Sequence, residues 1–205
     1  QAVNLRLERG TIALIETAVF APVLPLTDAM LGLTPPASGR IFFGGRDWQE
    51  MDADESCAAR GSIGCVFSGT AWVSNLNADE NVLLAARHHG RIPPETARDR
   101  AAALARGLGL DGLPAARPAW VDRHVLQKAQ LVRALAGDPV LIILEDLTDH
   151  ESDADADLMI RTVQDAVAGG VAAVWMTRDA RVYDNASISA AVRYKMDGLK
   201  LMVKS

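Results

Sequence analysis

Apolar residues recur along this chain with two spacings, and each spacing predicts one kind of element. Short runs that are apolar throughout, or that alternate with polar residues, have the pattern of strands when glycine, proline or serine bounds them. Such runs predict strands at residues 3–10, 11–16, 38–45, 62–67, 139–146 and 171–177. The tail, residues 190–204, predicts a hairpin, because an Asp-Gly pair at residues 197–198 favours a tight turn.

Other segments place apolar residues three and four positions apart, which is the spacing of one helix face. The first covers residues 25–33, where Pro25 suits the first turn. Its apolar face is formed by Leu26, Met30 and Leu33. Longer helices are predicted at residues 78–90, 95–110, 124–137 and 153–170.

The order of these elements predicts an α/β fold. A strand, a helix and a strand follow one another over residues 139–177, which implies a right-handed parallel crossover. The run "PVLIILED" is continuously apolar before its acidic end, as in strands that a parallel sheet buries on both faces. Residues from about 75 to 135 are predicted to be helical, and they separate two sheet regions. We therefore expect one domain, residues 1–205, with a helical subdomain inserted in an α/β core.

Composition narrows the class of protein. The 205 residues are 49% hydrophobic, which suffices for one globular domain with a core. The net charge of -5 disfavours nucleic acid as the main partner. No run of about 20 apolar residues occurs, so we expect no direct membrane insertion. Cys57 and Cys65 lack metal-ligand spacing, and we expect reduced thiols.

Four segments carry a more specific pattern. They are "LGLTPPASGRIFFGGRD", "RGSIGCVFSGTAWVSNLNADENVLL", "LVRALAGDPVLIILEDLTD" and "VWMTRDA". Taken in order, they resemble the stretch after the phosphate loop, the Q-loop region, the Walker B strand and the switch strand of the ATP-binding cassette (ABC) superfamily. Residues 67–82 also resemble cassettes of the lipid-trafficking importer type. The resemblance implies a P-loop NTPase-like fold with a mostly parallel sheet, an antiparallel β subdomain and a helical subdomain.

The phosphate loop of that family has no counterpart here. Such a loop needs glycines to turn its N–H groups toward phosphate, a lysine for the phosphates and a hydroxyl for Mg²⁺. The resemblance places these positions on Thr17, Phe20, Pro22, Val23 and Leu24. No lysine occurs before residue 128. We expect a packed connection that does not hold a triphosphate.

The Walker B carboxylates are present in reverse order. The family ends this strand with Asp, which holds the Mg²⁺ shell, and then Glu, which orients water. Here Glu145 precedes Asp146, and both groups could still bind a cation. The alternative is an acidic strand end that leads into a solvated helix N-terminus.

The remaining nucleotide contacts are also altered. The signature motif falls on residues 121–125, where Asp122 would repel a phosphate and is expected to cap a helix instead. Arg123 could attract an anion. The Q-loop glutamine aligns with Ser68 and the switch histidine with Arg178, which cannot accept a hydrogen bond.

The other candidate residues give weaker signals. His88 and His89 are adjacent on a predicted helix, so they should face different ways, and we expect no metal site. The resemblance makes Ser68, Trp72 and Asn75 candidates for contact with a partner. Core packing of Trp72 remains open.

These patterns favour a cassette whose scaffold persists and whose ATP site does not. The expected role is a non-catalytic subunit or docking module of a membrane transport system, with no cofactor. Its partner would be an integral-membrane permease, another ABC ATPase subunit or a second copy. The location would be cytoplasmic, peripheral to the inner membrane through that partner. The alternatives are a soluble scaffold unrelated to transport, or an ATPase with divergent chemistry that uses ATP and Mg²⁺.

Overall fold

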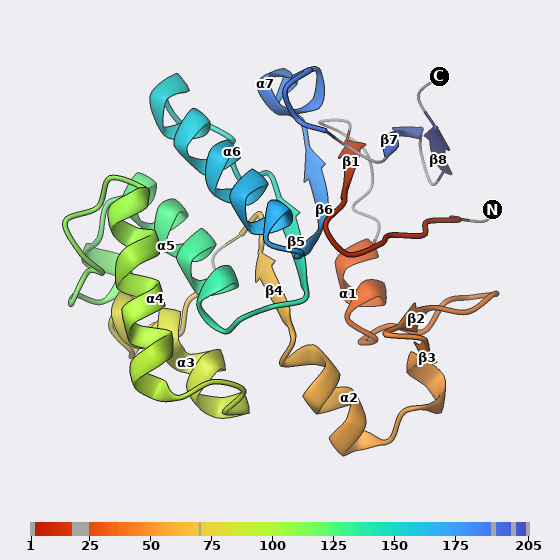
Figure 1. Ribbon diagram of the computed structural model, residues 1–205, viewed down its shortest axis with the longest axis horizontal. Helices are drawn as coiled ribbons and strands as arrows, with labels where there is room; N and C mark the ends of the chain where they lie inside the picture. Colours follow the sequence, from red (N-terminus) through yellow and green to blue (C-terminus); the bar gives the residue numbers. More distant parts are fainter. Residues whose placement is uncertain (1–2, 18–24, 70, 190–191, 198–199, 204–205) are drawn as a thin grey trace.

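A six-stranded sheet lies at the centre of the fold (Figure 1). The computed structural model describes residues 3–17, 25–69, 71–189, 192–197 and 200–203. Within them the strand order is β4-β5-β6-β1-β7-β8, with β7 and β8 antiparallel and the other neighbours parallel. The strands are β1 (Ile12–Glu16), β4 (Ile63–Val66), β5 (Leu141–Glu145), β6 (Ala172–Thr177), β7 (Val192–Asp197) and β8 (Lys200–Val203). The predicted mostly parallel α/β sheet is confirmed.

The C-terminal hairpin and a second, smaller sheet are antiparallel. The pairing of β7 with β8 confirms the predicted hairpin, although residues 198–199 of its turn lie outside the described residues. The smaller sheet pairs β2 (Phe42–Phe43) with β3 (Arg46–Asp47). A single strand was expected over residues 38–45. Gly44 and Gly45, both at positive φ, instead turn the chain back there.

The segment before β1 differs from the prediction. Residues 3–8 form no strand. Leu5 and Leu7 pack against the smaller of two apolar clusters, so burial of alternate leucines explains the strand-like pattern without backbone pairing.

Three of the helices pack together beside the edge strand β4. The helices α3 (Ala78–His89), α4 (Pro94–Gly107) and α5 (Arg123–Ala136) gather beside β4 (Figure 1). The others are α1 (Leu26–Met30), α2 (Ala53–Arg60), α6 (Asp153–Ala168) and α7 (Ala180–Tyr183), and short 3-10 turns occur at η1 (Trp48–Glu50) and η2 (Pro118–Trp120). Helix α5 approaches β4 closely because Gly64 lacks a side chain. A methyl group there would overlap the backbone carbonyl of Ala134.

The sheet separates two apolar clusters because alternate residues of a strand point to opposite faces. In β5, Ile142 and Leu144 join the larger cluster with helices α3 to α6, whereas Ile143 joins the smaller one. Trp175 of β6 is fully buried in the larger cluster.

Helix α1 is shorter than predicted. It ends at Met30, and Leu31 is buried where Leu33 was expected to be, since Leu33 is 58% exposed. Gly32 follows at φ 65°, and any side chain there would overlap the indole of Trp48. The turn at Gly32 therefore takes the chain off the helix before a second turn is completed.

Candidate functional site

The carboxyl ends of β4, β5 and β6 meet at one edge of the sheet, because the three strands run parallel. Ser68, Glu145 and Arg178 lie at or just beyond these ends. They are the positions that the resemblance assigns to the Q-loop, the Walker B motif and the switch. The fold therefore brings these three predicted site residues to one place.

Glu145 is held by two donors of the protein itself. The hydroxyl of Thr27, a buried residue of α1, donates to Oε1 of Glu145. The backbone N–H of Ser68 donates to Oε2 at 3.0 Å. Each carboxylate oxygen thus has a donor, and the end of β5 is tied to α1 and to the segment after β4. Thr27 gave no signal in the sequence.

Asp146 is paired with Arg178. The guanidinium lies 3.0 Å from Oδ2 of Asp146 and 2.7 Å from Oδ2 of Asp149. Burial raises the pKa of Asp146, and the hydrogen bond and charge of Arg178 oppose that effect only in part. The backbone of Asp146 is left-handed, with φ 46°, and its N–H donates to the carbonyl of Met176.

Three of the four oxygens of the two Walker B-position carboxylates have donors within the protein. Both oxygens of Glu145 and Oδ2 of Asp146 already have donors in the protein. Oδ1 of Asp146 is buried, with no hydrogen-bond partner among the described residues. Cation binding through Glu145 or through Oδ2 of Asp146 would first require these contacts to break.

A second network supports the same region. Asp179 accepts from the hydroxyl of Thr148 at 2.6 Å and from Arg181 at 2.8 Å. Burial alone would raise the pKa of Asp179, but the hydrogen bonds from Arg181 and Thr148 hold it below its ordinary value. Arg181 also bonds Asp153 and the carbonyl of Thr148. The segments after β5 and β6 are thereby fixed to one another.

The signature-motif positions begin α5. Asp122 caps this helix by accepting from the N–H of His124 at 2.8 Å, which confirms the predicted capping role. Arg123 is exposed. The ring Nδ1 of His124 lies 2.9 Å from Oε2 of Glu151, whose side chain is buried, and this hydrogen bond and charge raise the pKa of His124. The pairing of His124 with Glu151 was not anticipated.

The candidate partner surface is only partly exposed. Ser68 and Asn75 are exposed, but Trp72 is half-buried against the larger apolar cluster. The guanidinium of Arg133 lies 4.8 Å from the Trp72 ring and donates to the carbonyl of Ala71. Burial lowers the pKa of Arg133. Trp72 therefore has a packing role.

The phosphate-loop positions are described only at their start. Thr17 donates its N–H to the carbonyl of Thr177 at 3.0 Å. Glu16, at the end of β1, pairs with Lys195 of β7 at 3.1 Å. Phe20, Pro22, Val23 and Leu24 lie outside the described residues, so the prediction of a packed loop stays a prediction.

The two adjacent histidines correct another expectation. His88 and His89 were expected to face different ways, yet their rings meet edge to face with centroids 4.9 Å apart. They end α3, and long imidazole side chains can converge there even though their β-carbons diverge. Cys57 lies with them: Sγ and one ring nitrogen of each histidine are all within 4.8 Å of one another.

The fold is that of a cassette of the P-loop NTPase class. Three features identify it: the sheet order, the helices α3 to α5 beside β4, and the residues clustered at the strand ends. Solved structures agree on the fold: the dimeric cassette MJ0796 bound to ADP and Pi matches with a TM-score of 0.84 at 20% identity, over 98% of this chain and 88% of that one. The cassette cbiO1 of Clostridium perfringens matches with a TM-score of 0.76 at 17% identity, over 98% and 79%. The family model described as ABC transporter matches residues 25–149, so the chain belongs to the ABC transporter family.

Curated relatives come from several kinds of transport system. The phospholipid transport ATP-binding protein MlaF of Haemophilus influenzae is 27% identical over 70% of this chain and 54% of its own length. The macrolide export protein MacB of Burkholderia pseudomallei is 28% identical over 88% and 28%. The methionine import protein MetN of Geobacillus kaustophilus is 28% identical over 77% and 47%. The chain thus spans about half of MlaF and MetN, and about a quarter of MacB.

Proposed function

We propose that this chain is a cassette subunit of a membrane transport assembly that neither binds nor hydrolyses ATP with useful affinity. Residues 1–205 would act as one cassette domain. The observation that carries the proposal is the set of contacts that the two strand-end carboxylates make within the protein. Thr27 and the Ser68 backbone hold Glu145, and Arg178 holds Asp146.

The energies involved favour retention of these contacts. A hydrogen bond to a charged group contributes about 1.5 to 3 kcal/mol, so freeing both carboxylates for a metal would cost several such bonds. Arg178 also carries a permanent charge and cannot accept a hydrogen bond, unlike the histidine of the family pattern. The missing glycines and lysine of residues 17–24 point the same way.

Nucleotide binding tests this part of the proposal. The purified chain is titrated with a fluorescent ATP analogue, with and without Mg²⁺, beside an ABC cassette that has an intact phosphate loop. We expect no saturable signal up to about 1 mM, the upper end of ordinary enzyme-substrate affinities. Micromolar, Mg²⁺-dependent binding would refute it.

The transport role rests on the family and on the names of the relatives, all of which are transport proteins. The likeness of residues 67–82 to lipid-trafficking cassettes, together with MlaF, favours a phospholipid system. The chain would be cytoplasmic and peripheral to the inner membrane through an integral-membrane permease. Among the described residues, no helix has the length and apolarity to span a bilayer.

A pull-down from native membranes tests the partner. We expect a polytopic membrane protein to co-purify, and Asn75→Arg, at an exposed position within residues 67–82, to reduce its recovery. Asn4→Arg is the matched control, because Asn4 is also exposed and lies outside residues 67–82. Recovery of soluble partners or homo-oligomers alone would favour a scaffold unrelated to transport.

A second candidate function is an ATPase with divergent chemistry. Two adjacent carboxylates, Glu145 and Asp146, at the end of a buried parallel strand favour it. It requires Mg²⁺-dependent phosphate release that is lost in Glu145→Gln or Asp146→Asn. Release at the rate of the buffer blank would eliminate this candidate.

A further inference from the structure

The described chain brings one thiol and two imidazoles together at the junction of two helices. Cys57 lies on α2, and His88 and His89 end α3. One ligand atom of each residue lies within 4.8 Å of the other two. The strand β4 and the segment after it separate these helices in sequence, so the fold rather than a sequence motif creates the cluster.

The backbone fixes this junction at Gly61. The ring of His89 lies so close to Gly61 that any side chain at residue 61 would overlap it. Cys57 precedes Gly61 by four residues and therefore faces the same way, one helical turn earlier. Gly90, in the left-handed conformation at φ 59°, ends α3 directly after the histidines. Close packing thus holds α2 and the end of α3 in contact at the cluster.

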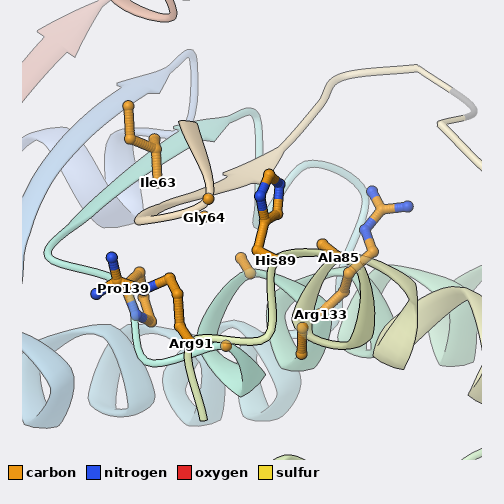
Figure 2. A pocket seen from close by; sticks show the side chains of 11 residues that line it. Ile63, Gly64, Ala85, His89, Arg91, Arg133 and Pro139 are labelled. Atoms are coloured by element: carbon orange, nitrogen blue, oxygen red, sulfur yellow. The ribbon is translucent and has the colours of Figure 1, made fainter. Parts of the chain in front are cut away.

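The cluster lies away from the strand-end carboxylates. His89 lines a small cavity of about 30 Å³ together with Ile63, Gly64 and Pro139. Figure 2 shows its ring directed from the end of α3 toward the strand that carries Ile63 and Gly64. These neighbours are at the amino ends of β4 and β5, whereas Glu145 is at the carboxyl end of β5.

The donor set suits one class of metal. Zinc is bound by cysteine sulfur at about 2.3 Å and histidine nitrogen at about 2.0 to 2.1 Å, so ligand atoms round one ion lie about 3.4 to 3.6 Å apart. Cys57 and His88 are exposed, and rotation of their side chains can close the present separations.

We propose that Cys57, His88 and His89 form a binding site for a divalent zinc-class ion. Three protein ligands leave a fourth position for water or an external ligand. The ion would link the end of α2 to the end of α3 and so join α2 to the group of helices α3 to α5. This inference is independent of whether the chain uses ATP.

Cobalt is the probe, because it takes the same ligands and reports them by absorption. The reduced full chain, without a histidine tag, is titrated with Co²⁺. We expect a thiolate-to-cobalt charge-transfer band that saturates at one equivalent and disappears when Zn²⁺ is added. Zn²⁺ should also raise the midpoint of thermal unfolding by several degrees, since it binds the folded chain.

Matched variants distinguish a specific metal site at these three residues from a general affinity of the chain for metal ions. Cys57→Ser should abolish the band, and His88→Gln should weaken Zn²⁺ binding at least about tenfold, the cost that loss of a supporting contact alone can reach. Circular dichroism checks that both variants fold. His150→Gln, which replaces an exposed histidine elsewhere, should bind like the unaltered chain. No band in the unaltered chain, or equal Zn²⁺ affinity in Cys57→Ser, overturns the proposal.

Discussion

The guanidinium of Arg178 lies 3.0 Å from the carboxylate of Asp146 and joins the ends of two neighbouring strands. Asp146 directly follows β5, and Arg178 directly follows β6. The same guanidinium reaches Asp149 at 2.7 Å. One cation therefore serves two acidic groups at the edge of the sheet where the family places its switch residue.

Replacing Arg178 by Met should lower the free energy of unfolding by about 1 to 2 kcal/mol near neutral pH, because a half-buried carboxylate loses its cation while the pair is partly exposed. The folded-state pKa of Asp146 is raised, and it should rise further in the variant. A carboxyl group with a raised pKa in the folded state destabilises the protein less as the pH falls. The variant's loss of free energy of unfolding, its stability deficit, should therefore shrink as the pH is lowered from about 7.5 to about 5.

Urea unfolding at both pH values measures this deficit. The control is the double variant Arg178→Met with Asp146→Asn, in which the pH-dependent part of the loss should disappear. A deficit that grows on acidification would contradict the assignment.

The contact of His124 with Glu151 should make the protein more stable at lower pH. The pKa of His124 is raised by this hydrogen bond, so the added stability is complete below about pH 6.5, the unfolded value. It is lost as the pH rises through the folded-state value. In Glu151→Gln, the pKa of His124 measured by NMR should return toward about 6.5. The control is Glu8→Gln, at an exposed glutamate elsewhere, which should leave the raised pKa of His124 in place. An unchanged pKa of His124 in Glu151→Gln would contradict the prediction.

Gly64→Ala should be strongly destabilising. The added methyl group meets the backbone carbonyl of Ala134, which cannot move without shifting α5 from the sheet. We expect a loss of about 3 kcal/mol or more in urea unfolding. Gly107→Ala is the matched control: it ends α4, a methyl group there meets nothing, and it should leave the stability unchanged or slightly higher. Equal effects at the two glycines would rule out this packing account.

The two thiols should react at very different rates. Burial raises the pKa of Cys65 to about 12, and the charge of Glu145 contributes to the rise. At about pH 8 only about one Cys65 in ten thousand is a thiolate. Cys57 is exposed. A thiol reagent should therefore modify one cysteine rapidly and the second far more slowly, with the rapid phase absent in Cys57→Ser. Two rapid phases in the native protein would contradict the burial of Cys65.

Most of the sheet could be predicted from apolar runs. The runs that became β1, β4, β5 and β6 are short, apolar and bounded by turn residues, and each lies in the core. The segment of residues 3–8 shows the limit of that rule. Its leucines alternate as in a strand, yet packing alone buries them in part, and the periodicity of side chains does not report backbone pairing.

The site was predictable in its positions and not in its contacts. The parallel order brings Ser68, Glu145 and Arg178 to one edge, and the resemblance identified all three. The bond from Thr27 to Glu145 joins residues 118 positions apart, and no local pattern encodes such a partner. The convergence of His88 and His89 was missed for a related reason, because helix geometry predicts directions at the β-carbon and not where long side chains meet.

The double anchoring of Glu145 has a consequence for evolution and engineering. A substitution that removes the carboxylate of residue 145 breaks the links to α1 and to the segment after β4, so it would begin with a loss of stability. Arg178 imposes a similar barrier at residue 146. Changes made one at a time among Thr27, Glu145, Asp146 and Arg178 would therefore pass through weakened intermediates, so we expect these four residues to change together.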